Sequence, residues 1–190
     1  MPLNVSSRAN CATVEEKVAK LSEFIVADLD TRTQHGLQAA GCYLLIARSS
    51  QSPVAQALRA NASRLAAANV TIRAIFCEVM PTGAPIGGPS DECRVARDPR
   101  LLAAHEQLVL APDRAWIGDC MRREPTKRDT YERFAENSGE VATVATRSFE
   151  RLWRAAVPMR TLPQMPAAFA SHLPGFSGTP VARPESPRRQ

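Results

Sequence analysis

A strand–helix–strand pattern across residues 41–80 is the feature that most constrains the fold. The run GCYLLIARSS is apolar and ends in small polar residues, which indicates a buried strand. Ser52 and Pro53 then mark a helix start, because serine is a common N-cap and proline suits the first helical position. A helix is expected over residues 54–69, with Asn69 as its stop, and VTIRAIFCEVM has the β-branched residues of a second strand. This order predicts a βαβ unit whose two strands are parallel.

An amphipathic helix is predicted before this unit, in residues 12–39. Thr13 and Glu16 have the spacing of a capping box, and residues 1–11 are expected to be disordered. The apolar residues then recur every three or four positions, at Val14, Val18, Leu21, Ile25 and Leu29. We expect this stripe to pack on the helix's own domain, the alternative being a dimer-forming helix.

Further elements are predicted after the βαβ unit. The turn-rich residues 81–100 indicate a surface loop, and HEQLVLAPDRAWIGD indicates two strands joined by a tight turn at Pro112 and Asp113. Residues 130–137 suit strand or helix, and we favour a strand because a strong helix start follows at Ser138. That last helix shows one apolar face and ends at Pro158. The face is formed by Val141, Val144, Ala145, Phe149, Leu152, Trp153 and Ala156.

Composition excludes several classes of protein. No apolar run is long enough to span a membrane, and the N-terminus lacks the apolar segment of a secretory signal, so a cytoplasmic location is expected. The five cysteines have no metal-ligand spacing, so neither a metal nor another cofactor is expected, and Cys42 and Cys77 are predicted to be small core residues. Both tryptophans are expected in the core. The net charge of +5 does not by itself indicate a nucleic-acid-binding domain, because the proline-rich tail of residues 158–190 carries much of it.

Taken in order, the elements between roughly residues 41 and 157 resemble one half of a phospholipase D-like protein. The family often carries a Phe-x-x-Leu-Trp segment in the closing helix, and this chain has Phe149, Leu152 and Trp153. The resemblance implies an α/β domain with a mixed sheet flanked by helices. To this the sequence adds the N-terminal helix, within a domain of residues 12–157, and a largely disordered proline-rich C-terminal tail.

The family motif is degenerate in this chain. The family has a histidine, a lysine two residues later and an aspartate five residues after the lysine, usually followed by Gly-Ser-x-Asn. Here the histidine is His105, but the lysine position holds Gln107 and the aspartate position holds Pro112. Gly118 matches the glycine, and the next three residues are Asp-Cys-Met.

The resemblance also implies a chemistry and an oligomeric state. In the family, one histidine attacks phosphorus, a second protonates the leaving oxygen, and the lysine neutralises the nonbridging oxygens. Gln107 carries no charge, and losing such a cation costs several kcal/mol of transition-state stabilisation, on the order of a thousandfold in rate. Members with one motif copy supply the second histidine by forming homodimers, so a homodimer is implied here.

The candidate site residues follow from the motif and its surroundings. His105 is the candidate catalytic residue, with a strand histidine bonded to a neighbour as the simpler interpretation. Candidates for binding a phosphate-bearing ligand are Gln107, Arg122, Arg123, Lys127, Ser49 and Ser50. The simpler interpretations are a solvated loop for the basic residues 122–128 and helix capping for the serines. His35 and His172 lack motif context and are expected to be solvated.

Three functions are consistent with the sequence. The favoured hypothesis is a non-catalytic phospholipase D-like protein, a homodimeric scaffold or a module that binds a partner or a phosphate-bearing ligand. The first alternative is a divergent phosphodiesterase or nuclease that uses His105 with recruited basic residues. The second alternative is a nucleic-acid-binding protein that uses the basic loop 122–128 and the tail.

Overall fold

The computed structural model describes residues 13–35, 40–78, 86, 90–122 and 132–159. The chain divides into two units, residues 1–159 and residues 160–190, and all the described residues belong to the first. The predictions for the N-terminal residues 1–11 and for nearly all of the tail therefore lie outside the described residues. Arg123, Lys127, Arg128 and His172 also lie outside them.

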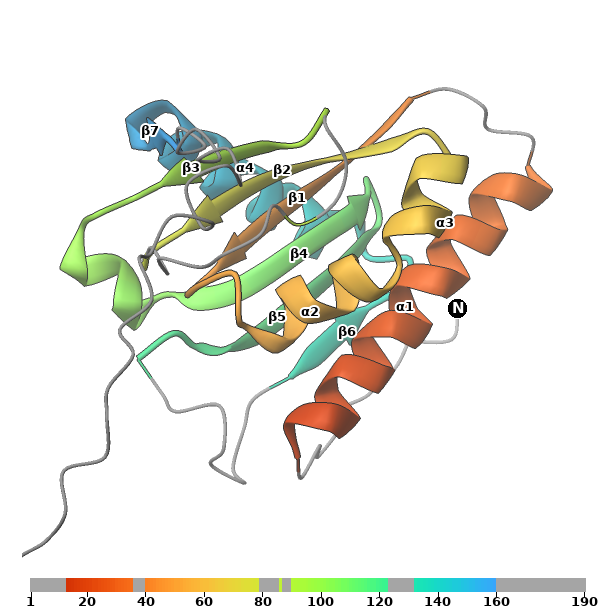
Figure 1. The fold of residues 1–190 in the computed structure, drawn as a ribbon, viewed down its shortest axis with the longest axis horizontal. Coiled ribbons are helices and arrows are strands. Elements are labelled where there is room, and N and C mark those ends of the chain that lie inside the picture. The colour runs from red at the N-terminus through yellow and green to blue at the C-terminus, as the bar shows by residue number, and fades with distance from the viewer. Residues whose placement is uncertain (1–12, 36–39, 79–85, 87–89, 123–131, 160–190) are drawn as a thin grey trace, which may run out of the picture. The chain divides into compact units, whose positions relative to one another are not determined.

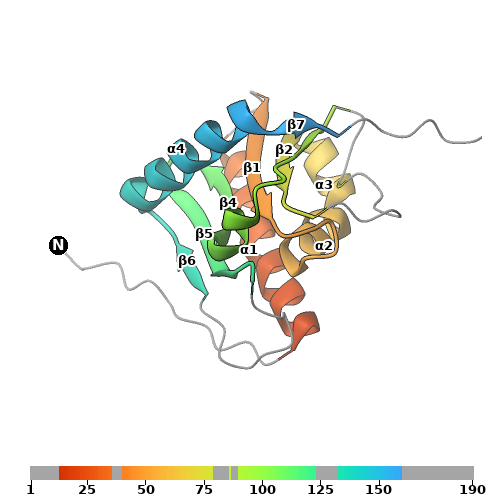
Figure 2. The same ribbon diagram turned by 90° about the vertical axis from the view of Figure 1, so that its left-hand side faces the viewer.

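A mixed sheet forms the centre of the described fold, with helices on both faces (Figure 1, Figure 2). The helices are α1 (Val14–Gln34), α2 (Pro53–Ala60), α3 (Ala62–Ala67), the 3-10 helix η1 (Pro99–Ala103) and α4 (Gly139–Ala155). The strands are β1 (Gly41–Ala47), β2 (Val70–Phe76), β3 (Glu92–Val95), β4 (His105–Ala111), β5 (Arg114–Cys120), β6 (Arg133–Ala135) and β7 (Val157–Pro158). None of the described helices has the length and apolar character needed to cross a membrane.

The seven described strands have the order β6-β5-β4-β1-β2-β3-β7. β1 pairs in parallel with β2, in the register Gly41 to Val70, which confirms the predicted βαβ unit. β4 pairs antiparallel with β1 and with β5, and the turn at Pro112 and Asp113 joins β4 to β5 as predicted. The fold-class prediction, an α/β domain with a mixed sheet flanked by helices, is confirmed.

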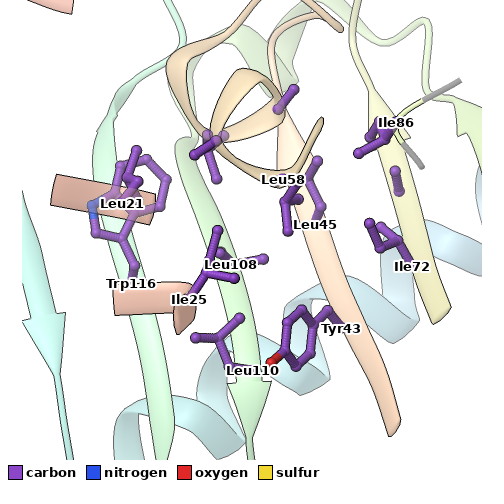
Figure 3. Packing of buried hydrophobic residues seen from close by; sticks show 14 of the residues in the cluster. Leu21, Ile25, Tyr43, Leu45, Leu58, Ile72, Ile86, Leu108, Leu110 and Trp116 are labelled. Carbon is purple, nitrogen blue, oxygen red and sulfur yellow. The ribbon is translucent and has the colours of Figure 1, made fainter. Parts of the chain in front are cut away.

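Helices α1 and α2 cover one face of the sheet (Figure 1). The predicted capping box begins α1, since the Glu16 amide donates to Thr13 Oγ1 and the Thr13 amide donates to Glu16 Oε2. Leu21 and Ile25 are fully buried against β-strand residues such as Leu108 and Trp116 (Figure 3). The apolar stripe of α1 therefore packs on its own domain.

Helix α4 covers the other face (Figure 2). Its Phe149 and Trp153 are buried with their rings stacked, 5.3 Å between centroids. The guanidinium carbons of Arg73 and Arg94 each lie 4.3 Å from the centroid of the Trp153 ring. The Phe-x-x-Leu-Trp segment thus fixes α4 to β2 and β3 by burial and by cation–π contacts, and both tryptophans are core residues as predicted.

Some local predictions were wrong. Residues 81–100 were expected to be a loop, but β3 lies within them, because a short half-polar strand gains its hydrogen bonds from β2 and β7 rather than from an apolar pattern of its own. Cys42 is exposed rather than buried, and Val144 is 59% exposed on α4. The helix expected over residues 54–69 is broken at Asn61, whose side-chain amide donates to the Ala57 carbonyl.

Other local predictions were correct. Asn69, the predicted stop, has a φ of 53°, the left-handed conformation that asparagine tolerates after a helix. Residues 133–135 form the strand β6 that we favoured over a helix. Helix α4 starts directly after Ser138 and ends before Pro158.

Candidate functional site

His105 is the first residue of β4, at the end of the sheet where β1 and β2 finish. It pairs in register with Cys120 of β5, and a register shift follows before the pair formed by Gln107 and Ile117. Such a bulge bends a strand and re-aims its backbone groups. His105 Nδ1 lies 2.8 Å from the Gly118 carbonyl oxygen, which falls within this bulge.

This contact sets the tautomer of the His105 ring. A carbonyl oxygen can only accept a hydrogen bond, so Nδ1 carries the proton and donates to Gly118. In the neutral ring the lone pair is then on Nε2. The His105 residue is exposed, so the structure provides an oriented imidazole at the surface of this end of the sheet.

Gln107 follows two residues later and, by strand alternation, points to the same face as His105. Its side chain is enclosed beneath α4, with the residue 8% exposed. Gln107 Nε2 donates a hydrogen bond of 2.9 Å to the backbone oxygen of Ala145. The Gln107 side chain therefore fastens β4 to α4.

The Pro112–Asp113 turn lies at the opposite end of β4 from His105. The strand His105–Ala111 separates them, a length of about 20 Å at roughly 3.3 Å per residue. Both turn residues are exposed, and the Asp113 carbonyl accepts a hydrogen bond from the Ser138 amide just before α4. The structure does not bring Asp113 to His105.

Glu106, which the sequence reading did not single out, points to the face opposite His105, toward α2. Its Oε1 accepts a hydrogen bond of 2.9 Å from the Arg48 amide, and its carboxyl group also bonds the Ser52 side chain. It therefore joins the start of β4 to the loop between β1 and α2. In the sequence, Glu106 could have been noticed because it is a charged residue on the strand face that Leu108 and Leu110 make apolar.

Burial raises the pKa of the Glu106 carboxyl group above its usual range. The hydrogen bonds from Ser52 and Arg48 and the charge of Lys17 act in the opposite direction without cancelling the effect. Lys17 is itself buried, with its Nζ 3.9 Å from Glu132 Oε1. Glu106, Lys17 and Glu132 are therefore enclosed charged groups at this end of the sheet.

Ser49 and Ser50 are both buried in the loop that precedes α2. The Ser49 hydroxyl accepts from the Gln51 amide, and the Ser49 amide donates to Ser52 Oγ at 3.3 Å. Ser52 is the N-cap residue, but no side-chain capping bond is formed. The serines of this loop thus bond to one another and to neighbouring backbone, and Ser52 also bonds the Glu106 carboxyl group.

Arg122 is exposed and lies two residues beyond Cys120, the partner of His105 in the sheet. The Met121 amide donates to the Ala104 carbonyl, so the chain remains beside the start of β4 up to this point. Of the predicted basic cluster, Arg122 is the member that lies within the described residues. His35 is exposed at the C-terminal end of α1, away from this group, as expected for a solvated histidine.

The described residues contain no group of three or more histidine, cysteine or acidic side chains that could hold a metal ion. The Cys120 thiol donates to the Leu102 carbonyl at 3.2 Å. Burial, with the charges of Glu106 and Glu78, raises the pKa of Cys77 to about 11, so this thiol stays protonated near neutral pH. Cys77 Sγ lies 3.6 Å from Met121 Sδ, a packing contact.

Neither a protein-family profile nor a curated protein matches this sequence. Among solved structures, TrmBL2, described as an archaeal chromatin protein with a novel mode of DNA binding, matches with a TM-score of 0.50 at 11% identity. The match covers 84% of this chain, which spans 57% of the length of TrmBL2. At this identity the likeness shows a shared fold.

Two bacterial proteins also appear among the similar structures. NucT from Helicobacter pylori matches with a TM-score of 0.48 at 9% identity, over 77% of this chain and 92% of its own. Nuc from Salmonella typhimurium, a phospholipase D family member, matches with a TM-score of 0.45 at 12% identity, over 72% of this chain and 89% of its own.

Proposed function

We propose that this chain is a phospholipase D-like module that binds a phosphate-bearing ligand at the His105 end of the sheet without hydrolysing it. The order of elements and the position of His105 support the family. Arg122, two residues beyond the Cys120 partner of His105, provides hydrogen-bond donors and positive charge for an anion, and the His105 ring donates from Nε2 when both of its nitrogens carry a proton.

The hydrogen bond from Gln107 to Ala145 is the observation that carries the non-catalytic part of this proposal. A phosphodiesterase of this type needs a cation where negative charge develops on the nonbridging oxygens. Gln107 has no charge, and its amide is already used in a buried bond to α4. Ligand binding needs only modest complementarity, whereas turnover needs this additional stabilisation of the transition state.

A homodimer is part of the proposal, because a single motif copy supplies one histidine per chain. Light scattering of the full chain tests it. We expect about twice the 20.7 kDa mass of one chain, and a result at 20.7 kDa would contradict a dimer.

A divergent phosphodiesterase is the second candidate, and the tautomer of His105 favours it. With the proton held on Nδ1 by Gly118, the Nε2 lone pair has the character of a nucleophile or a general base. A recruited cation such as Arg122 would have to replace the missing lysine. Hydrolysis that depends on both His105 and Arg122 would favour this candidate over the first.

Binding of a phosphodiester can be followed at the His105 ring by NMR. Dimethyl phosphate, added in steps to the histidine-labelled full chain, is expected to shift the ring signals of His105 with saturation. The His105→Ala variant assigns those signals, and the Arg122→Gln variant is expected to weaken the binding. If the His105 signals do not move at tens of millimolar dimethyl phosphate, the proposed site is wrong.

A further inference from the structure

Three exposed arginines lie along the outward face of α4, separate from the His105 end of the sheet. They are Arg147, Arg151 and Arg154, here called the α4 arginine stripe. We propose that this stripe binds the phosphate backbone of a nucleic acid. The proposal does not depend on the proposed function, because it involves none of the residues assigned to the phosphodiester site.

The spacing of the stripe puts its three side chains on one side of the helix. Positions separated by four and by three residues are neighbours on a helix surface. Arg147 to Arg154 spans about 10 Å along the axis, which is roughly the axial rise of three nucleotides of one strand. The opposite side of α4 is buried against the sheet through Ala145, Phe149 and Trp153, so the stripe points away from the domain.

Intramolecular ion pairs do not account for the stripe. No acidic side chain within the described ranges forms a salt bridge with any of the three arginines. The nearest acid in sequence, Glu150, bonds Arg73 of β2 at 2.8 Å. Arg151 has an arginine four residues before it and another three residues after it, and like charges at these spacings destabilise a helix slightly.

The exposed charges of α4 are mostly positive, whereas charges of both signs are mixed on the opposite face of the domain. On the opposite face, the exposed carboxylates of α1 are accompanied by the half-buried cations Lys20, Arg32 and Arg59 and by the exposed Arg64 of α3. The exposed carboxylates are Glu15, Glu16, Glu23 and Asp30. The exposed charged side chains of α4 are one glutamate, Glu140, and the three arginines of the stripe. A long anion approaching the domain is therefore attracted more strongly to the α4 face than to the opposite face, where charges of the two signs offset each other.

The chemistry of the stripe favours a nucleic-acid backbone over a membrane surface. A membrane-bound helix needs its apolar face turned outward, but the apolar face of α4 is buried, and on its outer side only Val144 is a large exposed apolar residue. Arginine forks bind phosphate oxygens in pairs, which suits a row of phosphates. Trp153 is enclosed between two guanidinium groups, so base stacking on it is not available and binding should be independent of sequence.

Fluorescence anisotropy of the full chain with a labelled 20-base-pair DNA duplex tests the proposal across salt concentrations. The wild type is expected to bind with an affinity that falls steeply as salt increases. Replacing Arg147 and Arg151 by glutamine should reduce the log–log salt slope by about 2 and the affinity at 50–100 mM salt by about tenfold or more.

The matched control replaces Lys20 and Arg64, which lie on α1 and α3, by glutamine. It changes the net charge by the same amount and should leave the slope and the affinity unchanged. Equal losses in both variants, or no loss in the α4 variant, would overturn the proposal. So would the absence of binding to duplex and to single-stranded nucleic acid at low salt, or binding only to anionic vesicles.

Discussion

The side-chain amide of Gln107 donates a hydrogen bond of 2.9 Å to the backbone oxygen of Ala145. The bond links the strand that begins at His105 to the helix that covers that face of the sheet. It gives Gln107 a definite structural task, because the buried side chain fastens β4 to α4.

The first prediction concerns this bond. Gln107→Met keeps most of the side-chain volume but removes the donor, and we expect the free energy of unfolding to fall by about 1 kcal/mol. Gln107→Lys should cost more, because it places a charge in a buried position. Urea unfolding measures both. As a control, Gln56→Met removes an exposed bond to the Gln51 carbonyl and should change stability by less than about 0.5 kcal/mol.

The second prediction concerns Glu106 and pH. Because burial raises its folded-state pKa, Glu106 stabilises the folded protein most when it is protonated, below its unfolded pKa of about 4.3. That contribution is lost as pH rises from there through the raised folded-state pKa. We expect Glu106→Gln, which still accepts a bond from the Arg48 amide, to remove this part of the pH dependence and to gain stability relative to wild type as pH rises.

Urea unfolding at a series of pH values between 4 and 8 provides the measurement. Glu23→Gln, an exposed substitution on α1, is the control and should follow the wild-type profile. A Glu106→Gln profile parallel to that of the wild type over the whole range would contradict the assigned cause of the pKa shift.

The third prediction concerns the contact between Gly118 and Trp116. A Cβ atom at Gly118 would lie 2.2 Å from the Trp116 ring, which is 2% exposed and cannot move without disturbing the core. Gly118→Ala should therefore destabilise the protein by about 1–3 kcal/mol. At Gly139 a Cβ atom has its nearest contact at 3.9 Å, so Gly139→Ala should be neutral or stabilising. Equal melting temperatures for the two variants would show that the Trp116 ring is not fixed there.

The fourth prediction concerns a buried bond at the other end of the sheet. The Tyr43 hydroxyl donates to Asp28 Oδ2 at 2.7 Å, and Arg114 Nη1 lies 3.4 Å from Asp28 Oδ1. Tyr43→Phe should cost about 1.5–3 kcal/mol at neutral pH, because it removes a bond to a charged acceptor. Burial raises the pKa of Tyr43, so the wild type should also lose stability above pH ~10, where the tyrosine of the unfolded state ionises, and the variant should not. Urea unfolding at pH 7 and pH 10.5 distinguishes these results.

Much of the fold could be predicted because its signals are local. The capping box at Thr13, the serine–proline start of α2 and the left-handed Asn69 each reflect the chemistry of a few neighbouring residues. The β4–β5 hairpin was likewise visible from two apolar runs around the Pro112–Asp113 turn.

What the sequence did not reveal depends on contacts between distant segments. β3 is a strand because β2 and β7 supply its partners, and Cys42 is exposed although it lies within an apolar run. The contacts of Gln107 and Glu106 are made with Ala145 and Arg48, residues 38 and 58 positions away. No pattern within a single strand contains that information.

Hydrolysis of bis-p-nitrophenyl phosphate tests the central claim most directly, that this site binds phosphate esters without cleaving them. Purified wild-type chain and the His105→Ala variant are compared at equal concentration between pH 5 and pH 8, with release of nitrophenolate as the readout. The account predicts that wild type and variant give the same rate, equal to that of buffer. A wild-type rate above this background that is lost in His105→Ala would contradict it.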